Sequence, residues 1–237
     1  MMDLYGMSSP NVLKISIMLA ELGLAHRFHF VNLAAGEQFE PKFQALNPNG
    51  KVPVLVDQEG PGGRPYTVFE SGAILIYLAE KTGAFWAAEP IKRYDVLQWL
   101  MIQVANVGPM LGQLTHFVRF APAGNEYSAS RYRTAAGRLY DMLDRRLAGS
   151  AHLAGDDYSI ADIATFRWIW LYHQKHGMSW AEHPNLRRWC DQISARPAVA
   201  HALTEYEHRL GVDPGLQPIQ SEDGLDRFFG RGRHARQ

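Results

Sequence analysis

The fold is decided by residues 50–82, which read GKVPVLVDQEGPGGRPYTVFESGAILIYLAEKT. Residues 52–56 are a compact apolar strand, and residues 60–64 carry the glycines and prolines that are typical of a hairpin turn. Residues 66–69 read as the returning strand, after which Ser71 opens a helix. A hairpin that leads directly into a helix predicts a small sheet covered by helices.

The residues before this stretch alternate in the same way between short strands and helices. We expect a strand over residues 3–6, and then a helix that Ser9 caps and Pro10 begins. A strand over residues 26–33 and a short helix over residues 41–46 follow. The order of this part is strand, helix, strand, helix, strand, strand, helix.

Beyond residue 89 the strand signals vanish and only helical periodicity remains. The predicted helices cover residues 90–120, 126–147, 160–176, 185–195 and 198–210. Pro109 should kink or break the first of them. Ser159 and Asp162 form a variant capping box at the start of the third, with Asp in place of the usual Glu or Gln.

This change of character predicts an α+β domain over residues 1–84 and an all-helical domain over residues 90–211. Residues 212–237 form a C-terminal tail rich in Pro, Gly and charge. We interpret the tail as partly ordered, with Leu225, Phe228 and Phe229 available to dock on the body. The alternative is that its last residues, RGRHARQ, bind an acidic partner.

Composition excludes several classes of protein. The chain has 237 residues, of which 46 % are apolar and 20 % charged, so it is globular and not disordered. Lys plus Arg equals Asp plus Glu at 24 each, which argues against a nucleic-acid partner. The start lacks the pattern of a signal peptide, and no apolar run approaches the roughly 20 residues of a membrane span. We therefore expect a cytoplasmic protein with no membrane partner.

The motifs of common catalytic centres are missing. The single cysteine, Cys190, excludes a disulfide framework and a cysteine-ligated zinc site within one chain, and we expect it to be a buried thiol. His173 and His176 lack a third ligand nearby, so we interpret them as packing or exposed side chains and predict no metal. The sequence contains no phosphate-binding loop, dinucleotide fingerprint or nucleophile elbow.

Two features remain as candidates for a binding site. Pro53 cannot join a strand ladder, so it favours an edge or a cis bond that leaves the backbone of Val52 free for an extended ligand; a plain strand irregularity is the alternative. Ser71 and Glu70 at a helix N-terminus can hold a carboxylate and an ammonium, which together recognise an amino-acid head group. The alternative is that Ser71 is an N-cap and Glu70 a favourable charge near the helix dipole.

Three segments resemble the glutathione-binding segments of glutathione transferases: Ser9-Pro10-Asn11, residues 47–53 (NPNGKVP) and residues 69–78 (FESGAILIYL). Residues 36–39 (GEQF) and 108–113 (GPMLGQ) resemble the bacterial Nu class, whose members are glutathione-dependent disulfide-bond reductases. The likeness runs from Asp3 to about Leu203. It implies a thioredoxin-like first domain, and a helical second domain that forms the other side of the cleft.

The resemblance also implies roles for individual residues. It assigns glutathione binding to Gln38, Lys51, Val52, Pro53, Glu70, Ser71 and Arg131. Glu70 and Ser71 would take the γ-glutamyl group, and Gln38 and Lys51 the glycyl end or a second glutathione. Ser9 and Asn11 would face the sulfur as catalytic residues.

The chain departs from the class in two places. Serine stands at position 9, where the class commonly has threonine, and this change keeps the hydroxyl. Residues 102–106 read IQVAN, where the class favours Trp-Gln-x-Gly-Gly, so we expect a different shape of the second glutathione or substrate pocket.

The activity implied by the resemblance is reduction of small disulfides. Glutathione is the cosubstrate, its bound thiolate attacks the disulfide, and a second glutathione resolves the mixed disulfide. One alternative is a conventional transferase that conjugates glutathione to electrophiles, and another is a non-catalytic glutathione-binding or regulatory protein on the same fold. Members of the superfamily are usually homodimers, so we expect a homodimer.

Overall fold

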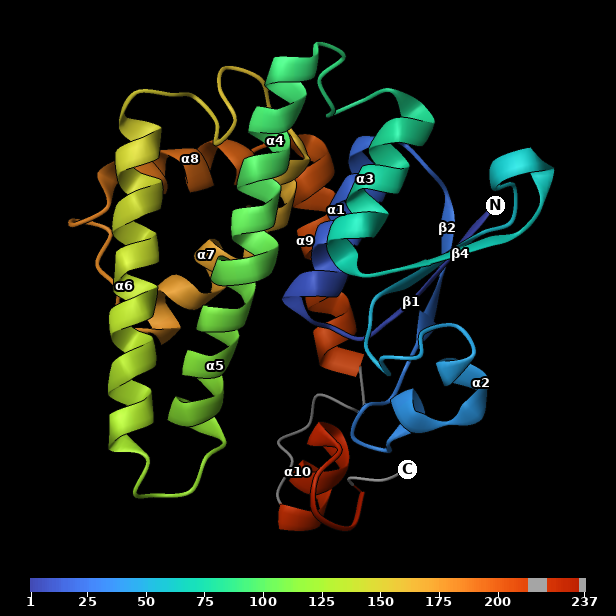
Figure 1. Cartoon of the computed structure of the whole chain (residues 1–237), viewed down its shortest axis with the longest axis vertical. Helices are drawn as coiled ribbons and strands as arrows, with labels where there is room; N and C mark the ends of the chain where they lie inside the picture. Colours follow the sequence, from blue (N-terminus) through green and yellow to red (C-terminus); the bar gives the residue numbers. More distant parts are fainter. Residues whose placement is uncertain (213–220, 235–237) are drawn as a thin grey trace. The chain divides into compact units, whose positions relative to one another are not determined.

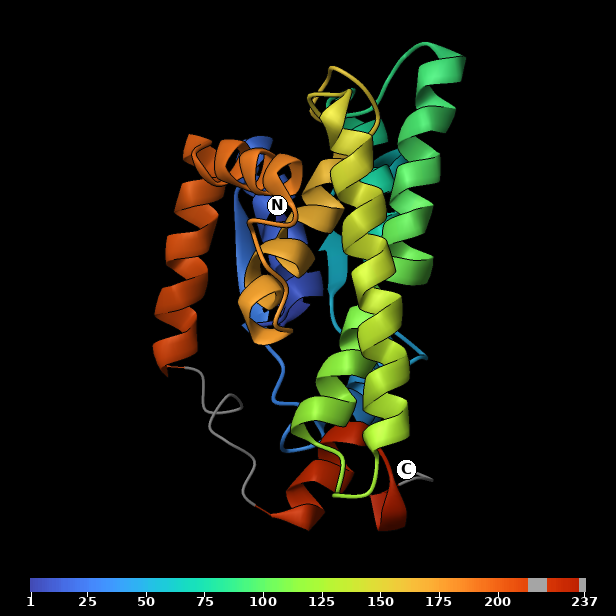
Figure 2. The same cartoon turned by 90° about the vertical axis from the view of Figure 1, so that its left-hand side faces the viewer.

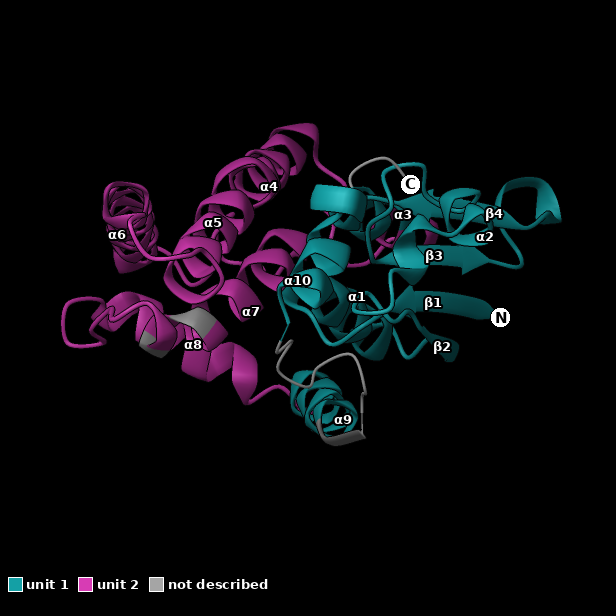
Figure 3. Cartoon of the chain, turned by 90° about the horizontal axis from the view of Figure 1, so that it is seen from below, with its two compact units in different colours: residues 1–77, 198–237 teal, residues 78–197 magenta. Residues whose placement is uncertain are grey.

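The computed structural model describes residues 1–212 and 221–234, with the exception of the side chains of residues 172, 174, 211 and 212. It divides into two compact units, coloured separately in Figure 3. Unit 1 comprises Met1–Tyr77 with the described part of Ala198–Gln237, and unit 2 comprises Leu78–Pro197.

Unit 1 is built on a four-stranded mixed sheet in the order β2-β1-β3-β4 (Figure 1). β1 (Met2–Gly6) pairs in parallel with β2 (His26–Phe30) and antiparallel with β3 (Val54–Asp57), which pairs antiparallel with β4 (Tyr66–Phe69). The predicted sequence of strands and helices is confirmed.

The register of the sheet brings one end of each of the four strands to the same place. Tyr5 pairs with Val54, and Val54 pairs with Phe69 on the next strand. Gly6 pairs with Phe30 on the other side. β1, β2 and β4 therefore finish, and β3 starts, at the same end of the sheet, which we call the site end.

Helices cover the sheet on both faces. α1 (Pro10–Glu21) is so enclosed that all residues from 12 to 19 are buried, the polar Lys14 and Ser16 among them. The short helices η1 (Glu37–Phe39) and α2 (Pro41–Gln44) follow β2, and α3 (Ser71–Thr82) follows β4.

Asp57 ties the hairpin turn to α3. The turn contains η2 (Pro61–Gly63). One carboxylate oxygen of Asp57 accepts a hydrogen bond from the backbone N–H of Glu59 (2.9 Å), and the other accepts from the hydroxyl of Tyr77 (2.6 Å). The middle of α3, where Tyr77 stands, is thereby tied to the end of β3 beside the hairpin turn.

Three predicted elements of unit 1 are longer than the observed ones. The strand over residues 26–33 ends at Phe30, because the Asn32 side chain accepts a hydrogen bond from the backbone N–H of Ala35 (3.1 Å) and starts a turn. The strand over residues 52–56 begins only at Val54, since the Val52–Pro53 bond is cis. The short helix from Pro41 ends at Gln44.

Unit 2 is helical. Its elements are α4 (Pro90–Ile102), η3 (Gln103–Val107), α5 (Gly108–Arg119), α6 (Glu126–Ala148), α7 (Ile160–Lys175) and α8 (Pro184–Ser194). α5 and α6 lie side by side in Figures 1 and 2. The break predicted at Pro109 lies just before it: η3 is a π-helical turn, and Pro109 stands in the first turn of α5, where its missing N–H costs little.

The predicted capping box at the start of α7 is confirmed. The hydroxyl of Ser159 accepts from the backbone N–H of Ala161 (3.3 Å), and the carboxylate of Asp162 accepts from the backbone N–H of Ser159 (3.0 Å). The same carboxylate also accepts from the backbone N–H of Leu153 and the indole of Trp189, each at 2.9 Å. Asp162 therefore links α7 to the preceding loop and to α8.

The chain returns to unit 1 with α9 (Pro197–Val212), and the described residues resume with α10 (Glu222–Phe229) and η5 (Gly232–His234). The sequence predicted a tail here and no helix, so α10 was missed. Residues 213–220 and 235–237 of the predicted tail lie outside the described residues. Among the helices of the described ranges, none is long and apolar enough to cross a membrane.

Candidate functional site

The site end of the sheet gathers the segments that carry most of the predicted site residues. Ser9 and Asn11 follow β1, Pro53 directly precedes β3, and Glu70 and Ser71 follow β4. Because these strand ends are neighbours in the register, the segments start from one edge of unit 1. This is the geometry of a binding site assembled from loops at the end of a sheet.

Ser9 caps α1 as predicted. Its backbone is extended, and its hydroxyl accepts a hydrogen bond from the backbone N–H of Val12 (3.4 Å) while Pro10 occupies the first turn. Asn11 stands in that same turn and is half-buried. A hydroxyl, an amide and the positive end of a helix dipole together favour a negative charge, such as a thiolate, at this point.

The loop before β3 is shaped by Asn47, which the sequence analysis gave no role. Its side-chain amide donates to the carbonyl of Lys51 (2.7 Å), and its side-chain oxygen accepts from the backbone N–H of Asn49 (2.9 Å). Gly50 adopts a positive φ of 61° within this turn. The buried Asn47 thereby holds the loop that ends in the cis Val52–Pro53 bond. The signal was an Asn-Pro-Asn-Gly run, which favours a turn.

Glu70 is held in an unusual backbone conformation at the start of α3. Its φ is +68°, in the left-handed region that non-glycine residues seldom adopt. Its carbonyl accepts from the backbone N–H of Ile74 (2.9 Å), so Glu70 and not Ser71 occupies the N-cap position. Ser71 is 8 % exposed and Glu70 is exposed. The alternative in which Ser71 is the N-cap is therefore wrong.

Lys14 is a charged residue near Glu70 that the sequence analysis missed. It lies on α1, one turn beyond Asn11, and is only 1 % exposed. Burial lowers the pKa of the Lys14 ammonium to about 7, and the negative charge of Glu70 acts in the opposite direction. The available signal was a lysine within a run of apolar helical residues. Such a lysine indicates a special role, because lysine is almost never fully buried without a partner.

We expect Lys14→Met to change how stability depends on pH. The unfolded chain keeps the lysine pKa near 10.5, so between about pH 7 and 10 the unfolded state binds more protons than the folded state. The free energy of unfolding of the wild type therefore rises with pH in this window, by up to about 1.4 kcal/mol per pH unit, relative to Lys14→Met. Urea unfolding at pH 7.5 and 9.5 measures this difference.

The exposed Lys81 supplies the matched control, because its side chain is solvated in the folded state as well. Lys81→Met should follow the wild-type pH dependence. Parallel stability curves for the wild type and Lys14→Met would contradict the lowered pKa of Lys14.

Gln38 and Lys51 differ in accessibility. Lys51 is exposed, whereas Gln38, in η1, is 2 % exposed. The side-chain amide of Gln38 donates to the carbonyls of Leu33 and of Phe228, both at 3.3 Å. Its side-chain oxygen is buried and has no hydrogen-bond partner among the described residues. Gln38 thus contacts Phe228 of α10, which lies 190 residues further along the chain.

Arg131 lies in unit 2, on α6, and not with the other predicted site residues of unit 1. It lines a groove of about 420 Å³ between α5 and α6. Residues that share this lining are Met110, Tyr127, Ser130, Tyr132, Thr134, Ala135 and Arg138. Two arginines in one groove give it a positive charge that suits an anionic ligand.

Cys190 is fully buried on α8, as predicted. Burial raises the pKa of its thiol well above the ordinary value, so the thiolate form is disfavoured. The two spaced histidines are buried as well: His173 stacks on Trp180 with ring centroids 3.4 Å apart, and His176 bonds the hydroxyl of Thr115 (2.9 Å). No group of residues suited to a metal ion is present within residues 1–212 and 221–234.

Comparison with known proteins identifies both halves of the chain. The glutathione S-transferase N-terminal domain model matches residues 8–81, and the glutathione S-transferase C-terminal domain model matches residues 107–197. The disulfide-bond oxidoreductase YfcG of Escherichia coli is 44 % identical over 204 residues, which cover 86 % of this chain and 94 % of that protein.

Solved structures of similar proteins contain glutathione. A glutathione transferase family member from Pseudomonas fluorescens, with two glutathione bound, is 40 % identical to this chain, with a TM-score of 0.80. The match covers 85 % of this chain and 92 % of that protein's chain. A glutathione transferase from Pseudomonas putida, with one glutathione disulfide bound per subunit, is also 40 % identical with a TM-score of 0.80, over 85 % and 90 % of the two chains.

These matches confirm the predicted fold, with a thioredoxin-like first part and a helical second part. They also agree with the resemblance carried by the segments around Ser9, Pro53 and Glu70. The chain belongs to the glutathione S-transferase family of enzymes.

Proposed function

We propose that this enzyme uses bound glutathione to reduce small disulfides. The proposal draws support from YfcG, a relative named as a disulfide-bond oxidoreductase, and from the two Pseudomonas proteins that bind two glutathiones or one glutathione disulfide. Both of those ligand states fit the two ends of such a reaction: two glutathione molecules enter, and one glutathione disulfide leaves.

The observation that carries the proposal is the state of Cys190. Disulfide exchange requires a thiolate that can reach the disulfide, and the only thiol of this chain is fully buried with a raised pKa. The protein therefore has no thiol of its own to offer. Glutathione brings one, so the protein has only to bind, orient and ionise it.

In this proposal the site end of the sheet binds the γ-glutamyl and cysteinyl parts of glutathione. The γ-glutamyl carboxylate binds Ser71 and the free N–H groups at the start of α3, and the γ-glutamyl ammonium binds Glu70. The cysteinyl backbone pairs with the backbone of Val52, which the cis bond to Pro53 leaves outside the ladder. This domain, residues 1–84, is then the glutathione-binding domain.

The remaining binding residues take the carboxylates of glutathione. Lys51 and Gln38 serve the glycyl end or a second glutathione, and Arg131 holds a carboxylate with its guanidinium. Of the three, Lys51 is exposed and Arg131 lines a groove, whereas Gln38 is buried under α10.

The chemistry begins with the glutathione sulfur at the N-terminus of α1. Ser9 and Asn11 donate hydrogen bonds to the sulfur and thereby favour its thiolate form. In solution a free thiol ionises only as the pH approaches its pKa of about 8.5. The thiolate attacks one sulfur of the disulfide, forms a mixed disulfide and expels a thiolate that takes up a proton. A second glutathione thiolate then attacks the mixed disulfide, which yields glutathione disulfide and the second free thiol.

We further infer that the chain belongs to the Nu class, acts as a homodimer and works in the cytoplasm. Residues 36–39 and 108–113 support the class, and the usual dimeric state of the superfamily supports the assembly. A glutathione-driven reductase needs a compartment rich in reduced glutathione, which supports the cytoplasm. Analytical ultracentrifugation tests the assembly: a monomer at micromolar concentration would contradict it.

Titration calorimetry with reduced and oxidised glutathione tests the function. We expect either two reduced molecules per subunit or tight binding of one oxidised molecule, because the reaction brings two glutathiones together. A single, weakly bound reduced molecule would favour conjugation to electrophiles, and an absence of binding would overturn both activities.

Asn11→Ala is expected to lower kcat at saturating glutathione by about tenfold, with a smaller effect on KM. Loss of one hydrogen bond to a charged sulfur corresponds to about 1.4 kcal/mol. The pH profile of kcat should also move upward, since the bound thiol loses a stabilising donor. Steady-state reduction of a small disulfide measures both effects. Turnover and a pH profile identical to those of the wild type would show that Asn11 does not act on the sulfur.

A further inference from the structure

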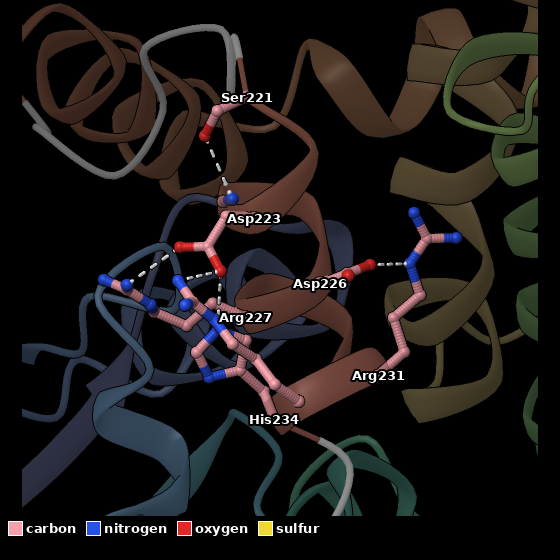
Figure 4. A network of polar contacts seen from close by, with 8 residues as sticks. Ser221, Asp223, Asp226, Arg227, Arg231 and His234 are labelled. Atoms are coloured by element: carbon pink, nitrogen blue, oxygen red, sulfur yellow. Dashed lines mark hydrogen bonds and ion pairs between the residues drawn. The ribbon is translucent and has the colours of Figure 1, made fainter.

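The C-terminal cap, as we call residues 221–234, is a small structure closed by its own ion pairs (Figure 4). The hydroxyl of Ser221 accepts from the backbone N–H of Gly224 (3.0 Å) and starts α10. Beyond α10 the chain folds back, so that Arg233 and His234 reach one oxygen of Asp223 at 2.5 and 3.0 Å. The described basic residues Arg233 and His234 therefore pair with an acidic side chain of the cap itself.

A second ion pair holds the turn of the cap. Arg231 pairs with the side chain of Asp226, and its backbone N–H donates to the Asp226 carbonyl (2.8 Å). The turn itself is made by Gly230, whose φ is +62°. Together with Asp223, which also pairs with Arg227 (3.2 Å), these contacts give a short segment a defined shape.

The cap contacts the segment of unit 1 that contains Gln38. The carbonyl of Phe228 accepts from the side-chain amide of Gln38 (3.3 Å). A Cβ on Gly230 would stand 2.6 Å from the ring of Phe39, and a Cβ on Gly36 would stand 3.1 Å from the side chain of Arg227. Close packing along residues 36–39 therefore accompanies the hydrogen bond.

These contacts occupy the side-chain amide of Gln38, which the proposed function assigns to glutathione. The amide of Gln38 has two N–H bonds, and the carbonyls of Leu33 and Phe228 take both. A glutathione carboxylate can accept a hydrogen bond from Gln38 only if one of these carbonyls is released. The Leu33 carbonyl belongs to the same loop as Gln38, so the contact with Phe228 is the one that can open.

We propose that the C-terminal cap is an autoinhibitory element that competes with glutathione for Gln38. The inference rests on the proposed function, which places Gln38 at the glycyl end or the second glutathione. In the closed state the cap occupies the amide of Gln38, and in the open state glutathione does. The apparent association constant for glutathione then equals the intrinsic constant multiplied by the fraction of chains in which the cap is open.

Gly230→Ala tests this in the full-length chain. The new methyl group meets the ring of Phe39 and stands at a positive φ, so it opposes docking of the cap without changing any residue of Met1–Tyr77. Gly62→Ala is the matched control: Gly62 has a φ of +70°, but nothing lies within 4 Å of its added Cβ. Hydrogen exchange of the cap checks that docking is weakened only in Gly230→Ala.

The readout is the dissociation constant of S-methylglutathione, which has both carboxylates and no thiol to ionise. We expect Gly230→Ala, and a chain that ends at Val212, to bind it about three- to tenfold more tightly than the wild type. Gly62→Ala should bind as the wild type does. In a Gln38→Ala background the gain from opening the cap should vanish, because the contested group is gone.

The outcomes separate the cap from the proposed function. If the wild type binds S-methylglutathione as tightly as Gly230→Ala and the shortened chain do, the cap is not inhibitory. Weaker binding by the shortened chain would show that the cap completes the site, and this would overturn the proposal as well. If neither the wild type nor the shortened chain binds, the proposed function fails and the cap fails with it.

Discussion

Asp162→Ala is expected to lower the free energy of unfolding by about 4 kcal/mol, the largest loss of stability we expect from a single substitution. The carboxylate is fully buried and accepts hydrogen bonds from the backbone of Leu153 and Ser159 and from the indole of Trp189. Alanine leaves these donors buried without an acceptor, and it removes the half of the capping box in which Asp162 accepts from the backbone of Ser159. The loss is large because each unsatisfied buried donor carries its own cost.

Burial raises the pKa of Asp162, while the hydrogen bonds from Leu153, Trp189 and Ser159 act against that shift. Chemical denaturation followed by far-ultraviolet circular dichroism measures the change in stability. Asp157→Ala, in the exposed loop just before the box, is the control and should stay within about 0.5 kcal/mol of the wild type. A loss below about 1 kcal/mol in Asp162→Ala would contradict the structural role of the box.

Glu70→Gln is expected to raise the KM for glutathione about 30-fold, with little effect on stability. The substitution keeps the shape of the side chain and the backbone at φ +68° but removes the charge that binds the γ-glutamyl ammonium. A hydrogen bond between two charged groups contributes about 2 kcal/mol, which corresponds to that factor. Steady-state kinetics at varied glutathione and saturating disulfide separate KM from kcat.

Glu80→Gln provides the control for Glu70→Gln, because Glu80 is an exposed carboxylate near the other end of α3. It should leave the KM for glutathione unchanged. An unchanged KM in Glu70→Gln would remove Glu70 from the binding site, and an equal rise in both variants would indicate a general effect of charge.

Local sequence patterns were sufficient to predict the elements whose ends are marked by turn or capping residues. β4 matches its prediction at both ends, since a turn precedes it and a helix start follows. The box of Ser159 and Asp162 was predictable because its members lie three residues apart and bond each other directly. Pro53 was read as an edge or cis residue, and the bond is cis.

The features that were missed depend on partners far away in the sequence. α10 has a short, charged sequence that alone favours a solvated tail, and its ion pairs become visible only when Arg231 and Arg233 fold back on it. The burial of Lys14 follows from the packing of α1 on all sides, of which the apolar residues around it in the helix were the only local signal. The contact of Gln38 with Phe228 joins the two ends of the chain.

The candidate site divides in the same way. That Glu70 and Pro53 stand at one end of the sheet follows from the hairpin of β3 and β4, which the sequence predicted, and from their register, which it did not. Their roles toward glutathione came from the resemblance to glutathione transferases. Arg131 lies in the other unit, so no local pattern linked it to these residues.

Turnover by a cysteine-free enzyme tests most directly whether glutathione supplies the reacting thiol. Cys190→Ala removes the only thiol of the chain, and circular dichroism and glutathione binding establish that the variant is folded. With reduced glutathione and a small disulfide such as 2-hydroxyethyl disulfide, we expect kcat to stay within about twofold of the wild type, with one glutathione disulfide formed per disulfide reduced. A folded variant that binds glutathione but no longer forms glutathione disulfide would contradict the account.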